Sequence, residues 1–246
     1  MKSTGTTPRG AAGEEQAARW VQGMFGRVAH RYDFLNHLLS FQLDRRWRAF
    51  TVRQVRDILV RPEARVLDLC CGTGDLLLAL EKERGGPVLG SDFCHPMLLE
   101  AQRKSVRREA ATALINADAL AMPFAPASLD LITVAFGFRN FANYRKGLRE
   151  LRRVLRPGGC LAILEFSQPP NRVFAGLYGF YSRHVLPRIG ALLSGEKDAY
   201  TYLPESVAKF PGPEELAREM SEAGFATVRF RRLTFGIVAL HLGYVE

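Results

Sequence analysis

The sequence predicts an α/β fold built on a doubly wound sheet of parallel strands. Short apolar runs that suit buried strands alternate along the chain with stretches whose apolar residues recur at helical spacing. The run Arg65–Leu69 ends at a glycine turn, and a second apolar run, Leu76–Leu80, follows it. A strand, a tight loop and a helix in this order place a ligand site at the carboxyl end of the strand.

The glycine turn carries the first indication of a ligand. Gly72 and Gly74 allow positive φ angles and a close approach of the backbone to a ligand. A dinucleotide-binding loop would need a third glycine where this chain has Leu77. Asp68, four residues before Gly72, would place a buried negative charge at the loop, which disfavours a pyrophosphate. It suits the cationic groups of S-adenosylmethionine, although a structural turn in an unrelated α/β protein is the alternative.

Composition and charge set broad limits on function. The chain has 246 residues, 47% of them hydrophobic, which is enough for one α/β domain with an added lid. A net charge of +9 would allow contact with nucleic acid or an anionic membrane, although a general preference for arginine explains it equally well. The four cysteines form no CxxC pair, so we expect neither a zinc site nor disulfides and favour the cytoplasm.

The two ends of the chain differ in composition. Residues 1–16 are small and polar, lack the apolar core of a signal peptide, and are predicted to be a disordered tail. Residues 17–246 are predicted to form a single domain, in which residues 17–60 are an aromatic-rich helical addition before the first strand. No run approaches the roughly 20 apolar residues that a membrane span needs.

The next two strands end in carboxylates. Asp92 closes the predicted strand Val88–Asp92, 18 residues after Gly74, near the spacing at which an acidic side chain binds the hydroxyls of a ribose. The predicted strand Ala113–Ala117 is followed by Asp118 and Ala119. Asp118 could accept a hydrogen bond from the amine of an adenine ring, or it could cap the turn, and the sequence favours neither.

The fourth strand leads to the predicted acceptor site. The run Leu131–Ala135 is apolar on both faces, as a buried parallel strand should be, and Phe136–Asn140 follows it. This stretch would lie across the switch point of the sheet from the ribose, where an acceptor substrate can meet the methyl group. Arg139 and Asn140 between aromatic residues suit a flat ring with polar edges. In the alternative, Arg139 pairs with the N-terminal helices.

The last third of the chain interrupts the alternation of strands and helices. A helix over 148–155 ends at the breakers Arg156–Gly159, and a fifth strand, Cys160–Phe166, follows. Residues 167–213 then form an aromatic, apolar insertion, which would either cover the site or form a dimer surface. A helix from Pro213 to Gly224 and two runs, 226–233 and 235–244, are predicted to close the chain as a hairpin.

Several motifs together resemble one family, the menaquinone/ubiquinone biosynthesis C-methyltransferases, over about residues 24–243. They are Tyr32-Asp33-x-x-Asn36 with Ser40 and Trp47-Arg48, Leu67-Asp68-x-x-Cys71-Gly72-Thr73-Gly74-Asp75, Phe136-Gly137-x-Arg139-Asn140, Arg156-Pro157-Gly158-Gly159, and Tyr200-x-Tyr202-Leu203-x-x-Ser206-x-x-x-Phe210-Pro211. The resemblance implies the Rossmann-like, seven-stranded class I fold of S-adenosylmethionine-dependent methyltransferases, with an N-terminal helical lid over 17–60 and a lid insertion over 167–213. It implies methylation of the ring of a polyprenylated quinol, demethylmenaquinol to menaquinol, and leaves the analogous ubiquinone step open.

The resemblance also assigns residues. The cofactor-binding set that it and the loop chemistry imply is Asp68, Gly72, Thr73, Gly74, Asp92, Asp118, Ala119 and Ala135, and the substrate-binding set is Tyr32, Asn36, Phe136, Tyr200 and Tyr202. The chain departs from the family pattern at four positions: Gln42 and Asp44 replace a glycine and a usual histidine, Asp118 stands where an asparagine is common, and Ala135 replaces a frequent serine.

The expected mechanism needs no metal. Arg139 would stabilise the phenolate of the quinol and Asn140 would orient it, with Asp33, Tyr200 and Tyr202 as candidate partners from the lids. The apolar stretch 173–193 would hold the prenyl tail, and the positive charge would favour peripheral membrane contact. The alternatives are a methyltransferase acting on RNA or DNA, disfavoured because no nucleic-acid module is visible, and a non-catalytic cofactor-binding partner in a quinone-synthesis complex.

Overall fold

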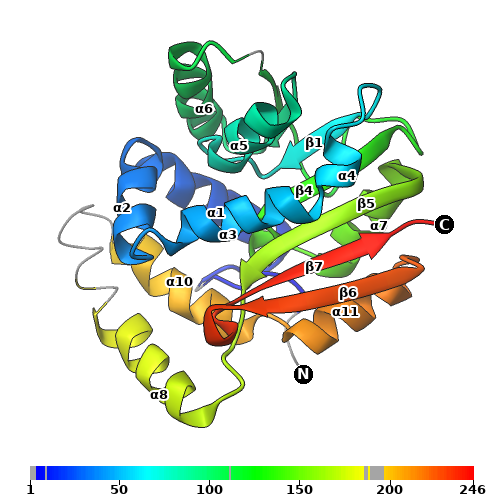
Figure 1. Ribbon diagram of the computed structural model, residues 1–246. Helices are drawn as coiled ribbons and strands as arrows, with labels where there is room; N and C mark the ends of the chain where they lie inside the picture. Colours follow the sequence, from blue (N-terminus) through cyan, green and yellow to red (C-terminus); the bar gives the residue numbers. More distant parts are fainter. Residues whose placement is uncertain (1–3, 9, 111, 186–187, 189–196) are drawn as a thin grey trace.

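Seven strands form one mixed sheet in the order β3-β2-β1-β4-β5-β7-β6, with helices on both faces (Figure 1). The computed structural model describes residues 4–8, 10–110, 112–185, 188 and 197–246. The first five strands run parallel, and β7 runs antiparallel to both of its neighbours. The strands are β1 Val66–Leu69, β2 Leu89–Asp92, β3 Ala113–Asn116, β4 Leu129–Ala135, β5 Leu155–Phe166, β6 Thr227–Leu233 and β7 Val238–Tyr244. The predicted fold class is confirmed.

The helices fall into two groups. Those of the sheet's own repeat are α5 Asp75–Arg84, α6 His95–Arg107, α7 Tyr144–Val154 and α11 Pro213–Glu222. Those of the N-terminal addition and of the insertion are α1 Glu14–Val28, α2 Tyr32–Leu39, α3 Leu43–Gln54, α4 Arg56–Leu59, α8 Arg172–Phe180 and α10 Lys197–Lys209. Short helical turns complete the chain: η1 Ala29–Arg31, η2 Phe138–Asn140, η3 Tyr181–Val185 and η4 Thr234–Gly236.

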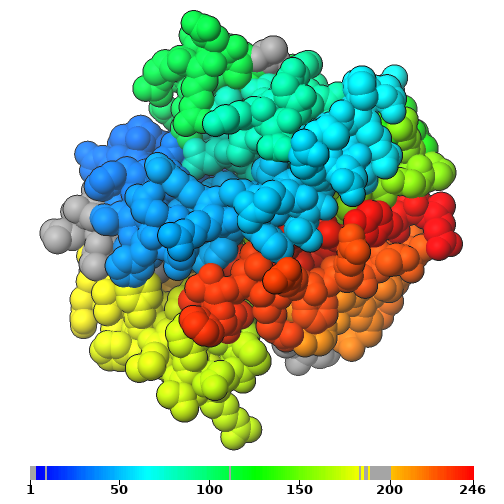
Figure 2. Space-filling view, in the orientation of Figure 1, coloured from blue at the N-terminus to red at the C-terminus, as the bar shows by residue number. Residues whose placement is uncertain are grey.

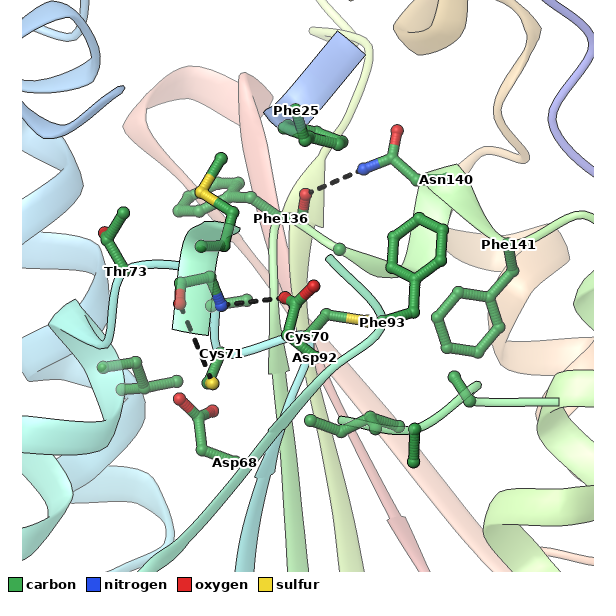
Figure 3. A pocket seen from close by; sticks show the side chains of 18 of the residues that line it. Phe25, Asp68, Cys70, Cys71, Thr73, Asp92, Phe93, Phe136, Asn140 and Phe141 are labelled. Carbon is green, nitrogen blue, oxygen red and sulfur yellow. Dashed lines mark hydrogen bonds between the residues drawn. The ribbon is translucent and has the colours of Figure 1, made fainter. Parts of the chain in front are cut away.

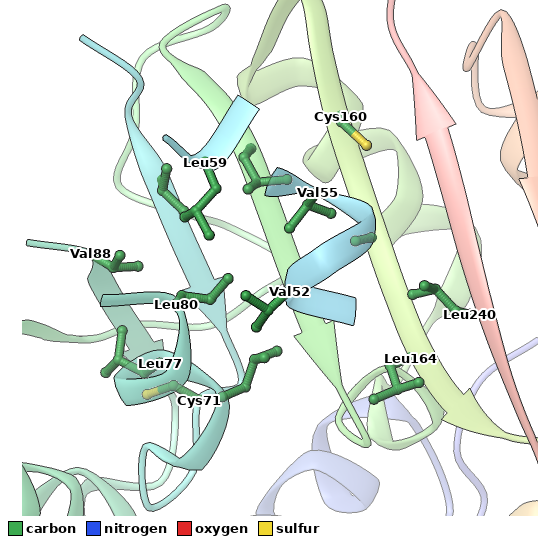
Figure 4. Close-up of a cluster of buried hydrophobic side chains, with 14 of the residues drawn as sticks. Val52, Val55, Leu59, Cys71, Leu77, Leu80, Val88, Cys160, Leu164 and Leu240 are labelled. Atoms are coloured by element: carbon green, nitrogen blue, oxygen red, sulfur yellow. The ribbon is translucent and has the colours of Figure 1, made fainter. Parts of the chain in front are cut away.

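Two apolar cores hold the helices against the sheet. On one face, residues of α3, α4 and α5 such as Val52, Leu59 and Leu77 form one core with residues of β1, β4, β5 and β7 (Figure 4). On the other face, α7 and α11 contribute residues such as Leu148 and Leu216 to a core that they share with β1, β4 and β5. The central strand β4 contributes to both cores because its side chains alternate between the two faces, which explains why its sequence is apolar throughout.

The strand order reverses between β1 and β4, which are paired in parallel from Val66↔Leu131 to Leu69↔Val134. Helices and loops leave both strands at the same edge of the sheet, so the glycine loop after β1 and the Phe136–Asn140 stretch after β4 meet there. This edge is the switch point at which doubly wound sheets bind ligands.

The largest differences from the predicted strand boundaries are at β5 and in the terminal hairpin. β5 begins at Leu155 rather than at Cys160, because Leu155 pairs with Leu129 before the register shifts at the breakers. The two runs of the hairpin are joined by the turn Thr234–Gly236 rather than by Thr234 alone, and β7 begins at Val238. Gly236 has a φ of 91°, and a Cβ there would lie 2.7 Å from Pro170 Cδ, so the turn packs closely on the chain that leaves β5.

Part of the segment that was predicted to be disordered has a defined place. The Tyr144 backbone N–H donates to the Thr4 carbonyl and the Thr6 N–H donates to the Phe141 carbonyl, both at 2.8 Å. The Thr6 side chain is buried, and α1 begins at Glu14. In the insertion, Leu186, Ile189, Leu192 and Leu193 of the predicted apolar stretch lie outside the described residues. No helix within the described part of the chain is long and apolar enough to cross a membrane.

Candidate functional site

The loop after β1 has the backbone conformation that its glycines predict. Gly72 has a φ of 54° and Gly74 a φ of 87°, both in the left-handed region that favours glycine. A Cβ on Gly74 would lie 3.3 Å from the Cβ of Ala101, whereas a Cβ on Gly72 would meet no atom within 4 Å. Gly72 therefore borders open space, and α5 begins directly after the loop at Asp75.

A first cavity, which we call the cofactor cavity, opens at this loop (Figure 3). Its wall is formed by the glycine loop, the ends of β1, β2 and β4, and the loop after β3. Of the eight residues predicted to bind a cofactor, seven line it: Asp68, Gly72, Thr73, Asp92, Asp118, Ala119 and Ala135. The eighth, Gly74, shapes the turn into α5.

Asp92 ties β2 to the glycine loop. Its carboxylate accepts hydrogen bonds from the backbone N–H of Gly72 at 2.9 Å and of Cys94 at 2.8 Å. Burial raises its pKa to about 6, and the backbone hydrogen bonds oppose that rise. Each carboxylate oxygen can accept a second hydrogen bond, so Asp92 can still bind a pair of hydroxyls.

Asp68 holds an unpaired charge below the loop. Its side chain is 1% exposed, and Oδ1 accepts a hydrogen bond from Thr133 Oγ1 at 2.6 Å. Oδ2 is buried and makes no hydrogen bond of normal geometry with the described residues. Burial raises the pKa of Asp68 to about 7. A buried carboxylate without a partner is costly, so a cationic group entering this cavity would stabilise it.

Of the two roles predicted for Asp118, the structure confirms the capping role. Its Oδ1 accepts a hydrogen bond from the Leu120 N–H at 2.9 Å, so the side chain caps the turn after β3. The residue also lines the cofactor cavity. Contact with an adenine amine therefore stays a prediction that the position of Asp118 permits.

A second and larger cavity, which we call the acceptor cavity, adjoins the first. It has a volume of about 610 Å³ and lies between α1, α2 and α3 on one side and α8, η3 and α10 on the other. Four residues line both cavities: Phe25, Tyr32, Arg48 and Phe136. The predicted substrate residues Asn36 and Tyr202 line the acceptor cavity as well. Tyr200 lies in α10, and its side chain is outside the described part of the chain.

Arg139 lies in the wall of the acceptor cavity and is 4% exposed. Its Nη1 donates to the Phe136 carbonyl and to Glu165 Oε1, the latter at 3.2 Å, so it pairs with β5 and not with the N-terminal helices. Its Nε–H is buried and has no partner among the described residues. Burial alone would lower the pKa of Arg139, but the nearby Glu165, Tyr202 and Tyr32 together raise it, so the guanidinium stays charged.

Asn140 links the two cavities to the N-terminal segment. It lines the cofactor cavity, and its Nδ2 donates to the Phe136 carbonyl at 3.4 Å (Figure 3). Its Oδ1 accepts a hydrogen bond from the Tyr202 hydroxyl at 2.9 Å. The Tyr202 hydroxyl is also 2.6 Å from Thr6 Oγ1. Arg139, Asn140 and Tyr202, predicted from distant motifs, are therefore brought together.

Asp33 does not lie where it could accept a proton from a ring in the acceptor cavity. It accepts a hydrogen bond from Thr73 Oγ1 in the glycine loop and pairs with Lys104 Nζ at 2.5 Å. Lys104 Nζ also contacts Asp75 Oδ1 at 2.6 Å. Asp33 lines neither cavity. It joins α2 to the glycine loop and α6, and its predicted catalytic role finds no support in this position.

Sequence reasoning assigned no role to four residues that shape the site. Lys104 binds Asp33, Glu165 binds Arg139, Thr6 binds Tyr202, and Arg48 reaches both cavities from a salt bridge with Asp44. Glu165 carried a usable signal, because a carboxylate near the end of a buried strand needs a partner. Thr6 carried none, because its neighbours are small and polar.

Comparison with known proteins gives consistent results. The model of the ubiE/COQ5 methyltransferase family matches residues 11–245. A demethylmenaquinone methyltransferase of Thermus thermophilus is 51% identical over 89% of this chain and 99% of its own length. Proteins of the same name from Deinococcus radiodurans and Staphylococcus aureus are 48% and 42% identical, over 91% and 92% of this chain and 91% and 93% of their own lengths.

Solved structures agree on the fold. A methyltransferase of Thermotoga maritima that depends on S-adenosylmethionine has a TM-score of 0.61 at 16% identity, over 91% of this chain and 99% of that chain. A similar protein of Aquifex aeolicus has a TM-score of 0.52 at 20% identity, over 79% and 88%. The family match, the relatives and the two adjoining cavities lead to one conclusion: the chain belongs to the ubiE/COQ5 methyltransferase family, as its motifs predicted.

Proposed function

We propose that this protein transfers the methyl group of S-adenosylmethionine to a ring carbon of demethylmenaquinol and so forms menaquinol. Membership of the family gives the reaction type and the cofactor. The relatives that match over most of the chain are named demethylmenaquinone methyltransferases. The structure adds the residues that would divide the work between the two cavities.

One observation carries the proposal. Asp68 Oδ2 and Arg139 Nε are charged-group atoms that are buried and have no partner among the described residues. The first lies in the cofactor cavity and the second in the acceptor cavity, and four shared residues separate them. A negative group on one side suits a cationic methyl donor. A positive group on the other suits an acceptor that becomes an anion.

The cofactor cavity fits S-adenosylmethionine through its own polar groups. Asp68 Oδ2 would accept a hydrogen bond from the ammonium group, and Asp92 would accept both ribose hydroxyls. Asp118 would face the adenine amine. When bound, S-adenosylmethionine supplies an electrophilic methyl group. The residues that line both cavities would orient that methyl group toward the acceptor cavity.

In the acceptor cavity, Arg139 would stabilise the deprotonated ring hydroxyl. Its free Nε–H can donate to the phenolate oxygen, and its pairing with Glu165 holds the guanidinium still. Once the hydroxyl has given its proton to solvent, the adjacent ring carbon would be nucleophilic and would take the methyl group from sulfur, leaving S-adenosylhomocysteine. That ring carbon then loses its hydrogen as a proton, which restores the aromatic ring. Asn140, held by Tyr202, would orient the ring. Alignment of this kind can supply on the order of 7–11 kcal/mol.

The size and lining of the acceptor cavity suit a ring with an attached tail. Its volume of about 610 Å³ is within the usual range for small-molecule sites. Aromatic and apolar residues such as Phe166 and Tyr178 form much of its wall. Each buried CH₂ of a prenyl tail would contribute about 0.8 kcal/mol. We also propose peripheral membrane contact, because the substrate is a lipid, whereas a homodimer stays a prediction that sedimentation can test.

The direct test is an assay with labelled S-adenosylmethionine and reduced demethylmenaquinone, run beside the ubiquinone precursor and RNA. We expect label in the menaquinone fraction. The full chain without quinol measures background, and the oxidised quinone is the matched control because it has no hydroxyl to deprotonate. Label in neither lipid would defeat the substrate assignment. Label in RNA, with RNA binding that falls steeply with salt, would favour the nucleic-acid alternative.

A further inference from the structure

Exposed apolar side chains gather around one part of the surface. Ten large hydrophobic residues are exposed among the described residues, and seven of them belong to three segments: α2 with the turn after it, α8, and η4. We call these seven the apolar rim: Phe34, Leu38, Phe41, Val173, Leu177, Phe180 and Phe235. Solvent-exposed apolar side chains are common singly, but a cluster of this kind indicates a binding surface.

The three segments of the rim touch one another. Phe41 packs against Tyr181 with ring centres 6.0 Å apart, and the Tyr181 hydroxyl donates to the Leu39 carbonyl at 2.9 Å. Phe174 of α8 packs against Phe235 with ring centres 5.1 Å apart. In Figure 2 the yellow α8 region lies beside both the blue N-terminal helices and the red turn between β6 and β7. The rim residues therefore belong to segments that are neighbours in space.

Helix α8 is apolar on two faces. Ala175, Tyr178 and Gly179 face inward and line the acceptor cavity. Val173, Leu177 and Phe180, spaced at i, i+4 and i+7, face outward and are 75%, 67% and 62% exposed. No residue of this helix is buried. A water-facing helix normally carries polar residues on its outer side, so α8 is suited to an apolar surrounding.

The rim borders the acceptor cavity at Phe41, and we infer that the mouth of that cavity lies there. Phe41 is 73% exposed and lines that cavity at the same time. A molecule that enters beside Phe41 passes from the rim directly into the space next to Arg139.

The charges next to the rim are positive. Arg45 and Arg46 follow Phe41, and Arg172 precedes Val173; all three are exposed. The acidic residues of α2, α3, α8 and η3 are Asp33 and Asp44, and both are paired with cations. Nothing exposed and acidic on these four elements opposes an anionic surface.

We propose that the apolar rim docks on an anionic lipid bilayer, so that a prenyl tail passes between the bilayer and the acceptor cavity without crossing water. The proposal rests on the proposed function for the lipid nature of the substrate. Apolar side chains would enter the boundary between headgroups and acyl chains, and the arginines would bind lipid phosphates. A second copy of the chain fits less well, because a protein seated on the rim would cover the mouth through which the tail must enter.

The first test is flotation of the full chain with vesicles of phosphatidylcholine and phosphatidylglycerol. The double variant Leu177→Gln/Phe180→Gln changes only outward-facing residues of α8, and we expect its partition coefficient to fall about tenfold or more. The matched control is Leu99→Gln/Val106→Gln on α6, where two exposed apolar residues lie outside the rim. Equal binding by the two double variants would overturn the proposal.

A second test separates docking from catalysis. With a short-chain, water-soluble demethylmenaquinol, the Leu177→Gln/Phe180→Gln variant should keep the wild-type kcat. With the long-chain quinol in anionic vesicles, its apparent KM should rise about tenfold. If the wild type methylates neither substrate, the proposed function is wrong. If the variant has the wild-type KM in vesicles, the docking surface is wrong. If the variant binds vesicles normally but changes from dimer to monomer in sedimentation, the rim is a dimer interface and the proposal is wrong.

A third test asks whether the arginines contribute to binding, with the double variant Arg45→Glu/Arg46→Glu and the same vesicles. We expect weaker binding to vesicles that contain phosphatidylglycerol, a loss that high salt reproduces in the wild type, and little change with pure phosphatidylcholine. Binding that ignores both lipid charge and salt would remove the arginines from the proposal.

Discussion

The two cavities are built in different ways. The cofactor cavity is formed at strand ends, where the backbone fixes Asp92 by two hydrogen bonds and the glycine loop by positive φ angles. The acceptor cavity is formed by helices that lie outside the strand–helix repeat and meet through side chains. Changes in the first should therefore alter cofactor affinity, whereas changes in the second should alter turnover and lipid handling.

The largest difference between the effect on turnover and the effect on cofactor affinity is expected at Arg139. Replacing it by Ala removes the charge that stabilises the phenolate, and we expect kcat to fall about 10²- to 10³-fold. Affinity for S-adenosylhomocysteine should stay within about twofold, because Arg139 lines only the acceptor cavity. Calorimetry and single-turnover assays measure the two quantities separately.

Two controls protect this result. Arg139→Lys keeps the charge but loses the Nε–H, so partial recovery is expected. Breaking a buried ion pair can cost about 3–5 kcal/mol of stability, so circular dichroism must show that the variants are folded. Turnover like that of the wild type in Arg139→Ala would remove this residue from the mechanism.

The converse change is Asp68→Asn in the cofactor cavity. A hydrogen bond to a charged group contributes about 1.5–3 kcal/mol, so S-adenosylmethionine should bind roughly 10- to 100-fold more weakly. The kcat at saturating cofactor should change far less. A large fall in kcat with unchanged affinity would contradict the division of work between the cavities.

Asp68 should also make both binding and stability depend on pH. Its folded pKa of about 7 is above the unfolded value of about 3.9, so the folded chain without ligand holds the proton more tightly. That contribution to stability is complete below about pH 4 and is lost as pH rises through 7. Over the same range S-adenosylmethionine should bind more tightly, because the carboxylate ionises. Urea unfolding and calorimetry at pH 5 and 8 should show both trends, and Asp68→Asn should reduce them.

A smaller effect is expected where the N-terminal helices meet the glycine loop. Lys104→Met leaves Asp33 and Asp75 without the cation between them, and we expect KM for S-adenosylmethionine to rise about three- to tenfold. Arg103→Met is the matched control, because Arg103 forms an exposed pair with Glu100 on the same helix. Identical kinetics for the two variants would show that the contact of Lys104 with Asp33 and Asp75 does not position the glycine loop for the cofactor.

The smallest effect is expected at Thr6. Thr6→Val removes one hydrogen bond to Tyr202 and leaves Asn140 as the partner of that hydroxyl, so kcat should fall about two- to threefold. The free energy of unfolding should fall by about 1 kcal/mol. Thr7→Val, one residue away, tests a threonine whose hydroxyl contacts only the exposed end of Lys209 in the described structure. A change as large as that of Thr6→Val would indicate a general effect of the segment.

The same contrast explains what the sequence could predict. Asp68, Asp92 and Asp118 were found because parallel strands place their carboxyl ends together, so position along the chain gives position in space. Asp33 could not be placed in this way. Its helix α2 is oriented by contacts with α3 and η1, and the side chain pairs with Lys104 of α6.

Two further differences have the same origin. Thr6 lies in a stretch whose composition suggested disorder, yet backbone hydrogen bonds to Phe141 and Tyr144 hold it, and composition carries no information about such partners. The pairing of Arg139 was also open in the sequence, because Glu165 is 26 residues away, on β5. Motifs gave the identities of the acceptor-side residues, and only packing gave their partners.

The walls shared by the two cavities have a consequence for inhibition. Because Phe25, Tyr32, Arg48 and Phe136 border both spaces, one compound could join an adenosyl group to a naphthol ring by a short linker and engage Asp68 and Arg139 together. Linking makes the second contact intramolecular, with an effective concentration in the millimolar range. Part of its affinity would come from the acceptor cavity, so it should favour this protein over methyltransferases that share only the glycine loop.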